Sequence, residues 1–144
     1  MRQVLKGATW SVIHTLGSAA AYHGLADSMG WSATESERRA PWLIGASFTI
    51  IYVKLSVAPG VGKTRTFTFR LDGASSALAV TISGASTTGV ATASVAAVNG
   101  STVGLLSTST GTPADTDVWW TIVPDTTDDS ESCYPFTGGL SGAG

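Results

Sequence analysis

Three runs of alternating residues within positions 47–83 constrain the fold more than any other part of the sequence. β-Branched and aromatic residues recur at every second position, which is the pattern of strands with one buried face. Asp72-Gly73 separates the second run from the third and supplies the positive φ angle of a tight reversal, so these runs are predicted to pair antiparallel. In the first run, the two expected faces are Phe48, Ile50 and Tyr52, and Ile51, Val53 and Leu55. In the next two runs, the expected apolar faces are Phe67, Phe69 and Leu71, and Leu78, Val80 and Ile82.

Further short strands are expected on both sides of this stretch. The candidates are residues 3–6, 9–15, 42–44, 90–98, 102–107 and 117–124. Asn99-Gly100 is typical of a hairpin turn and predicts that the runs 90–98 and 102–107 pair with each other. Segment 32–39 has only a weak helical pattern. The sequence therefore predicts an all-β protein, an antiparallel β-sandwich of about eight strands, and allows either a jelly-roll or an immunoglobulin-like topology.

Charge is distributed unusually along the chain. Charged residues make up only 12% of it, whereas hydrophobic residues make up an ordinary 43%. Residues 73–114 contain no charged and no aromatic residue, yet strand patterns persist there, so we interpret this segment as strands and not as a linker. Uncharged strands lack the usual protection against edge pairing. Their edges are therefore expected to be paired in the fold or covered in an assembly.

The overall balance of charge and cysteine excludes several classes of protein. A net charge of −2 argues against binding to nucleic acid. All eight lysines and arginines lie at or before Arg70, so residues 1–72 carry +4 and residues 73–144 carry −6. Cys133 is the only cysteine, which leaves no intrachain disulfide and no cysteine-based zinc site. No window approaches the roughly 18 apolar residues of a membrane span, and polar residues interrupt the N-terminal segment that would be a signal peptide, so assembly in the cytosol is expected.

No motif in the sequence predicts an enzyme, a cofactor site or a metal site. The segment Gly60–Thr64 (GVGKT) resembles the end of a phosphate-binding loop, but Val57 occupies the position of the first glycine and a strand pattern follows in place of a helix. His14 and His23 are nine residues apart and are expected to be structural. Cys133 has no nearby base.

Two sets of residues are candidates for contact with a partner. The aromatic candidates, for an interface or a glycan, are Trp10, Trp31, Trp42, Trp119 and Trp120; packing in the core is the competing interpretation. The basic candidates are Arg38 and Arg39, which either contact an anionic partner or bridge to local acids such as Glu35. The acidic residues between 125 and 131 are interpreted as a solvated loop, since their spacing is not that of a calcium site.

Four segments carry a resemblance to a known group of proteins. They are WSATESERRAPW, IYVKLSVAPGVGKTRTFTFRLDGA, LAVTISGASTTG and DVWWTIV, within residues 31–123. They resemble a widespread group of small β-rich proteins encoded mainly in tailed-phage and prophage genomes. The resemblance implies a virion protein with a trimeric jelly-roll fold, of the kind used for capsid decoration (cement) proteins or fibre heads. It brings no functional residues with it.

The resulting expectation is a non-enzymatic structural protein of the virion, assembled in the host cytoplasm. The expected role is a capsid decoration protein that forms a homotrimer and binds the major capsid protein or other virion proteins. The alternative is a tail-fibre or spike domain that binds host-surface glycan. A single domain is expected, with an N-terminal arm and peripheral strands (1–40), a sandwich core (41–124) and a C-terminal tail (125–144) whose ends embrace neighbouring subunits.

Overall fold

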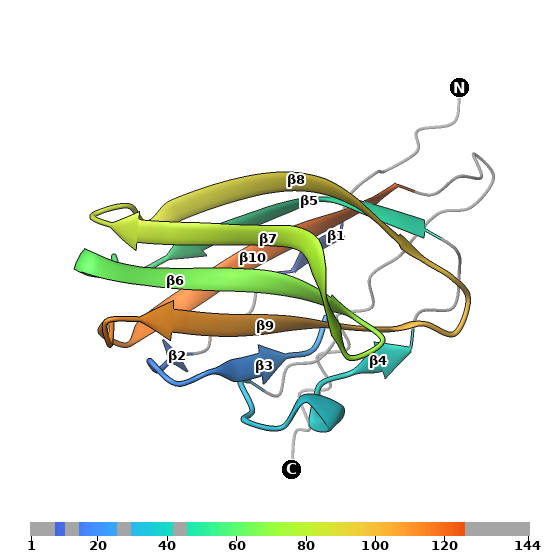
Figure 1. Ribbon diagram of the computed structural model, residues 1–144, viewed down its shortest axis with the longest axis horizontal. Coiled ribbons are helices and arrows are strands. Elements are labelled where there is room, and N and C mark those ends of the chain that lie inside the picture. The colour runs from blue at the N-terminus through green and yellow to red at the C-terminus, as the bar shows by residue number, and fades with distance from the viewer. Residues whose placement is uncertain (1–7, 11–14, 26–29, 42–45, 126–144) are drawn as a thin grey trace, which may run out of the picture.

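The computed structural model describes residues 8–10, 15–25, 30–41 and 46–125 (Figure 1). These residues form ten β-strands and one 3-10 turn, η1 (Glu35–Glu37). The strands are β1 (Ala8–Trp10), β2 (Thr15–Leu16), β3 (Ala21–His23), β4 (Ala40–Pro41), β5 (Ala46–Leu55), β6 (Gly60–Leu71), β7 (Ala74–Gly84), β8 (Thr88–Ala97), β9 (Thr102–Thr110) and β10 (Thr116–Asp125). All their pairings are antiparallel, which confirms the predicted all-β class. The predicted strands 3–6 and 42–44 and the tail 126–144 lie outside the described residues.

The strands form two sheets packed face to face, as Figure 1 shows. One sheet has the order β1-β10-β5-β8, with β2 also paired to β10; the other has the order β3-β9-β6-β7, with β4 also paired to β9. The short strands β1 and β2 lie along the same side of β10, and β3 and β4 lie along the same side of β9. Ten segments therefore occupy eight strand positions. The predicted antiparallel β-sandwich is confirmed.

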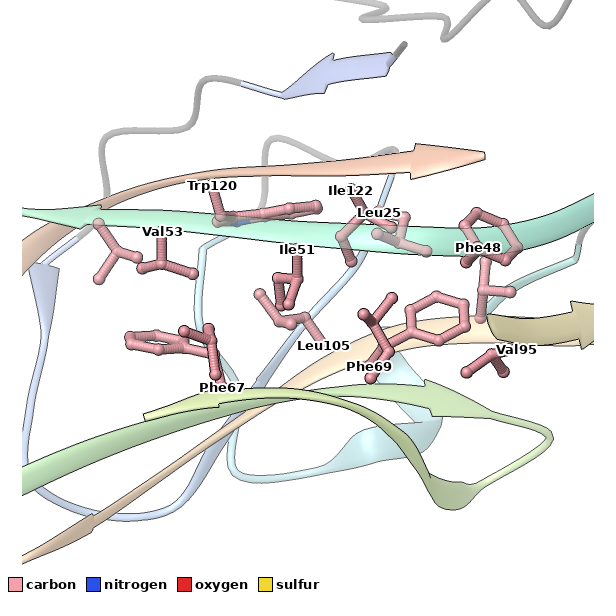
Figure 2. Close-up of a cluster of buried hydrophobic side chains, with 14 of the residues drawn as sticks. Leu25, Phe48, Ile51, Val53, Phe67, Phe69, Val95, Leu105, Trp120 and Ile122 are labelled. Atoms are coloured by element: carbon pink, nitrogen blue, oxygen red, sulfur yellow. The ribbon is translucent and has the colours of Figure 1, made fainter. Parts of the chain in front are cut away.

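The core lies between the sheets, where alternate residues of the long strands meet (Figure 2). Trp120 and Ile122 on β10 and Ile51 on β5 point toward Phe67 and Phe69 on β6 (Figure 2). These side chains are at most 1% exposed. The apolar faces predicted for the second and third runs are buried, apart from Leu71, which is half-buried. The period-two pattern thus placed most of the core, because each such strand has one face turned to the other sheet.

Phe48 lies on the opposite face from the one predicted. The alternation put it with Ile50 and Tyr52, but it is 2% exposed and its ring centroid lies 4.6 Å from that of Phe69 in the core. The pairing of β5 with β10 shifts register here, since Phe48 and Ile50 lie opposite the consecutive residues Pro124 and Val123. An extra residue in one strand reverses which face the following residues occupy, so a β-bulge explains the error.

The hairpin predicted at Asn99-Gly100 is wrong, although the one at Asp72-Gly73 is confirmed. Asp72 and Gly73 both have positive φ angles, 51° and 79°, and join the paired strands β6 and β7. In contrast, β8 pairs with β5 and β9 pairs with β6, so the chain crosses between the sheets at 98–101. Asp72 fixes this crossing, since its carboxylate accepts hydrogen bonds from the Thr102 amide (2.7 Å) and the Ser101 hydroxyl (3.2 Å).

Two segments differ from the sequence pattern in how much regular structure they contain. The weak helical pattern at 32–39 contains only η1, whose N-cap residue Thr34 makes no side-chain capping bond. The strand predicted at 102–107 extends as far as Thr110 in β9. The uncharged segment 73–114 forms β7, β8 and β9, as predicted, and is not a linker.

Arg65 is a fully buried charge that the sequence patterns did not assign. It precedes Phe67 on the inward face of β6 and is 0% exposed. Its guanidinium donates hydrogen bonds to the carbonyls of Gly17 (2.8 Å), Leu16 (3.2 Å) and Ala114 (2.7 Å). Burial lowers the pKa of Arg65, while nearby Asp115 acts in the opposite direction. The side chain therefore ties β6 in one sheet to β2 and the β9–β10 loop, which belong to the other.

The edges of the two sheets approach closely where β7 joins β8. A Cβ atom at Gly89 of β8 would lie 2.7 Å from Val80 Cγ2 and 2.9 Å from Ile82 Cγ1 of β7. Alanine or valine occupies every second position that follows on this face of β8, ending at Ala97. Small side chains therefore allow the two edges to close over the core at this end.

Replacement of Arg65 is expected to destabilise the fold. In Arg65→Met the three carbonyls lose their donor, but only the bond to Leu16 is fully buried. Because a buried acceptor left unsatisfied costs about 1–3 kcal/mol and a part-buried one less, we expect a loss of about 3 kcal/mol in the free energy of unfolding. Urea denaturation measures this loss. Lys54→Met is the control, because Lys54 is exposed and should change stability by no more than about 0.5 kcal/mol. Equal effects of the two changes would contradict the role assigned to Arg65.

Gly89→Ala is expected to destabilise the protein by about 1–3 kcal/mol, because the added methyl overpacks the closed edge. The backbone at Gly89 does not have a positive φ, so strain in the main chain does not contribute. Thermal unfolding should show a lower midpoint than for Thr92→Ala, a change at an exposed position of the same strand. A stabilised Gly89→Ala variant would show that the edges are not in close contact.

Candidate interaction surfaces

The outer face of the sheet β1-β10-β5-β8 combines a group of apolar side chains with Lys54 and several threonines. Its outward-facing apolar side chains in the described residues, here called the apolar face, are Ile50, Tyr52, Val90, Trp119 and Val123. Val90 is 64% exposed and Tyr52 is 42% exposed. Single exposed apolar residues are common on protein surfaces, whereas a contiguous group marks a contact site.

The strand register makes the apolar face continuous. Tyr52 on β5 lies opposite Val90 on β8, and Ile50 lies opposite Val123 on β10. Directly opposed residues on one face of antiparallel strands have Cβ atoms about 5 Å apart, close enough for side chains to touch. Trp119 continues the surface along β10, with the ammonium of Lys54 located 5.8 Å from the centroid of its ring. The surface thus spans three adjacent strands.

The outer face of the other sheet has different chemistry. Threonines from adjacent strands lie opposite one another, with Thr66 bonded to Thr81 and Thr64 bonded to Thr110, each pair at 2.8 Å between hydroxyl oxygens. These hydroxyls satisfy each other and remain in contact with water. The two outer faces of the sandwich therefore differ: threonines occur on both, but the aromatic and aliphatic group of the apolar face lies on the first.

The candidate tryptophans have separate locations. Trp120 is 1% exposed and belongs to the core, whereas Trp119 lies on the apolar face. Trp31 is half-buried and packs on the core, with its ring centroid 6.2 Å from that of Phe67. The backbone of Trp10 on β1 pairs with that of Trp120 on β10. Trp42 lies outside the described residues. Packing in the core, the competing interpretation of the tryptophans, therefore holds for Trp120.

The basic pair bonds to the protein itself. Arg39 forms a salt bridge with Glu35 at 3.1 Å, and the Nε atom of Arg38 donates to the Gly30 carbonyl at 3.0 Å. Arg70 on β6 also binds Glu35, at 2.8 Å, and so holds η1 against the second sheet. These bonds fit the interpretation that the pair bridges to local groups. The side chain of Arg39 is 38% exposed, so its guanidinium stays accessible to solvent despite the salt bridge.

The residues weighed for catalysis have structural positions where they are described. His23 is 1% exposed; its Nδ1 atom donates to the Gly24 carbonyl at 2.7 Å, and its ring lies 5.1 Å from that of Trp31. The glycines at 60 and 62 belong to the start of β6, which confirms that a strand and not a helix follows them. His14 and Cys133 lie outside the described residues. Within the described ranges, no group of three or more His, Cys, Asp or Glu residues could hold a metal ion.

A groove of about 380 Å³ opens between the edge strands β7 and β8. It is lined by residues 74–77 at the start of β7, residues 94–96 at the end of β8, and Leu71. All of these are uncharged, and most are serine or alanine. The two strands are close at the Gly89 end and leave this opening at the other end.

The sequence analysis singled out only tryptophans and arginines, and so missed four of the five residues of the apolar face. The signal was present in the alternation, because the outward faces of runs 47–55 and 117–124 also contain apolar residues. Neither a protein-family model nor a curated protein sequence matches this chain. No helix among the described residues is long and apolar enough to cross a membrane. Function therefore has to be inferred from the surfaces themselves.

The salt bridges of Glu35 predict a dependence of stability on pH. The hydrogen bond from Arg70 and, more weakly, that from Arg39 hold the pKa of Glu35 below its ordinary value of 4.5, against the opposing effect of burial. A carboxylate whose pKa is lowered by folding stabilises the protein above its unfolded pKa, and this contribution is lost as the pH falls through the folded pKa. We expect Glu35→Gln to cost about 1–2 kcal/mol at pH 7 and to cost progressively less below about pH 4.5.

Chemical denaturation of the original protein and of Glu35→Gln, between pH 7 and pH 3, measures the difference in their free energies of unfolding. Arg39→Gln, which removes only the more exposed partner of Glu35, is expected to cost less than Glu35→Gln at pH 7. A difference from the original protein that stayed constant down to pH 3 would show that ionised Glu35 does not contribute to stability.

Proposed function

We propose that this chain is a structural virion protein, a capsid decoration protein that assembles as a homotrimer and binds the major capsid protein. The observation that carries the proposal is the apolar face, which spans three strands of one sheet, whereas hydrogen-bonded threonine pairs lie on the outer face of the opposite sheet. A surface of this kind on a soluble domain is stabilised by burial against a partner, at about 25 cal/mol for each Å² of apolar area removed from water.

The order of the strands supports a jelly roll as the finer description of the fold. The pairs nest within one another: β1 and β2 pair with β10, β3 and β4 with β9, β5 with β8, and β6 with β7. These four sets of pairs form one long antiparallel hairpin. When this hairpin rolls up, β10 pairs with β5 and β9 pairs with β6, which gives two sheets with four strand positions each. This is the double-sheet arrangement of jelly rolls, which occurs in viral capsid proteins and also in lectins and cupins. The topology is therefore compatible with a virion protein and does not by itself select one.

The proposed mechanism is mechanical. Residues of the apolar face lie on long central and edge strands whose backbones are fixed by the sandwich, so the face is rigid before it binds. A preformed surface loses little conformational entropy on binding, and more of its buried area then contributes to affinity. Binding across neighbouring capsid subunits would resist their separation under internal pressure. No bond is made or broken, which is why the role needs no cofactor.

Glycan binding by a tail-fibre or spike domain is the alternative function. Trp119 is the one candidate tryptophan that the described residues place on an outer face, and it has Tyr52 on the next strand. Aromatic side chains at a surface suit stacking on sugars. However, Lys54 lies over the Trp119 ring, and the remaining members of the face are aliphatic. This composition favours a protein partner over a sugar.

A charge placed on the apolar face is expected to abolish binding to the capsid. Val90→Asp should lower the affinity at least tenfold, since an ionised carboxylate would be buried against the partner and one factor of ten corresponds to about 1.4 kcal/mol. Cosedimentation with heads assembled from the major capsid protein of the same genome measures the binding. Val98→Asp is the matched control, because Val98 is 67% exposed and lies beyond the end of β8, away from this face.

Equal loss of binding in both variants, or binding unaffected by either, would contradict the assignment of the face. Failure of the unmodified protein to bind heads would contradict the decoration role itself. A glycan array probed with the unmodified protein and with Trp119→Ala separates the alternative function. Binding that the substitution abolishes would favour the fibre role over the capsid role.

A further inference from the structure

One side of the sandwich ends in two long strands and the other side ends in short ones. The edges on the first side are β7, with 11 residues, and β8, with 10 residues. On the other side, the described edge strands β1 to β4 contain only two or three residues each. Short edge strands are one way in which proteins avoid pairing with other chains. Among the strands that the structure describes, only those of the β7–β8 side present a long row of backbone groups without a partner strand.

The long edges also lack two common protections, although β7 and β8 each shift register where they pair with β6 and β5. Neither β7 nor β8 contains a charged residue or a proline. Natural edge strands usually have lysines, prolines or covering segments that prevent intermolecular pairing. Because the side chains here are mostly alanine, serine and threonine, another strand could approach either edge without burying a charge. The uncharged composition of residues 73–114 thus has a specific location in the fold.

We infer that these edges pair between copies of this chain, with β7 of one subunit forming an antiparallel ladder with β8 of the next. Figure 1 shows that β7 and β8 run in opposite directions, joined by the short turn at residues 85–87. A neighbouring copy related by rotation about an axis parallel to the strands has its strands in the same directions as the first copy. Its β8 therefore runs antiparallel to β7 of the first copy. The inference rests on the proposed homotrimer and names the surface that holds it together.

A second copy suits these edges better than a separate peptide. An added peptide would pair with one edge and leave the other exposed, whereas a rotationally symmetric ring uses both edges of every subunit. Contact between identical chains often places like charges close together, and two edges without charge avoid that cost. The groove between residues 74–77 and 94–96 opens on this side, and its small side chains allow close approach of neighbouring backbones.

The groove also predicts which residues meet. Ala77 and Ser94 line the same groove and therefore lie at a similar level along the strands. Rotation about an axis parallel to the strands keeps that level, so Ala77 of one subunit should lie near Ser94 of the next. Both side chains are exposed in the single chain.

Disulfide cross-linking tests this register. Ala77→Cys and Ser94→Cys are made separately in a Cys133→Ser background, mixed after dissociation and reassociation, and oxidised. The expected result is a covalent dimer in the mixture and none in either variant alone. A dimer formed by one variant alone would indicate a two-fold pairing of like strands and would overturn the inference. An unmodified protein that forms oligomers while the mixture yields no cross-link would overturn it as well.

A lysine on the edge provides a second test with a closely matched control. Thr81 on β7 and Thr108 on β9 lie opposite Thr66 on its two sides, and both are exposed. Thr81→Lys is expected to reduce the mass measured by light scattering to the 14.7 kDa of one chain, while Thr108→Lys keeps the mass of the assembly. Circular dichroism checks that both variants are folded. An assembly unaffected by Thr81→Lys would contradict the role of the β7 edge.

These outcomes are distinct from those that test the capsid role. Cross-linking between Ala77→Cys and Ser94→Cys together with no binding to heads would retain the edge contact and reject the decoration function. Binding to heads that Val90→Asp abolishes, in an assembly without the cross-link, would retain the function and reject the edge contact. An unmodified protein that remains a single chain at all concentrations tested would reject the edge contact directly.

Discussion

The buried guanidinium of Arg65 holds the two sheets together where the chain crosses between them. A sandwich needs its crossings fixed, because crossing segments leave the hydrogen-bonded ladders and their carbonyls require other donors. Arg65 on β6 donates to the carbonyls of Leu16, at the end of β2, of Gly17, which follows it, and of Ala114, before β10. A charged group without a carboxylate partner is costly to bury, and its several hydrogen bonds reduce that cost. The carboxylate of Asp72 has the equivalent role for the crossing from β8 to β9.

Most charged side chains that are described in the first half of the chain bind connecting segments in this way. Lys63 donates to the Thr112 carbonyl at the same end of the molecule as Arg65, and the Glu35 salt bridges fix η1 against the second sheet. This use explains the uneven distribution of charge along the sequence. Basic residues on β6 thus bind segments from both halves of the chain, since Lys63 and Arg65 reach the loop before β10. The uncharged segment 73–114 supplies two edge strands and a central strand, whose contacts are backbone pairing and the core.

The sequence predicted the sandwich well and its crossings poorly, for a physical reason. Alternation reports which side of a strand is buried, so it identified the core of β6, β7 and β10. It does not report which strands pair, and Asn99-Gly100 was misread because local turn preference was outweighed by the placement of β8 beside β5. The bulge near Phe48 depends on a register that no local pattern encodes. The buried position of Arg65 was equally inaccessible, since its acceptors lie about fifty residues away in sequence.

The two proposed contacts use different directions of the same sheet and can therefore coexist. Side chains of a strand stand roughly perpendicular to the sheet, whereas backbone hydrogen bonds lie within it. On β8, the side chain of Val90 belongs to the apolar face, while the backbone of the same strand is the free edge. A neighbouring subunit added at that edge through its β7 would extend the sheet with its own hydroxylated face and leave the apolar face open to a partner. Self-assembly through the edge would in this way repeat the apolar face once per subunit without covering it.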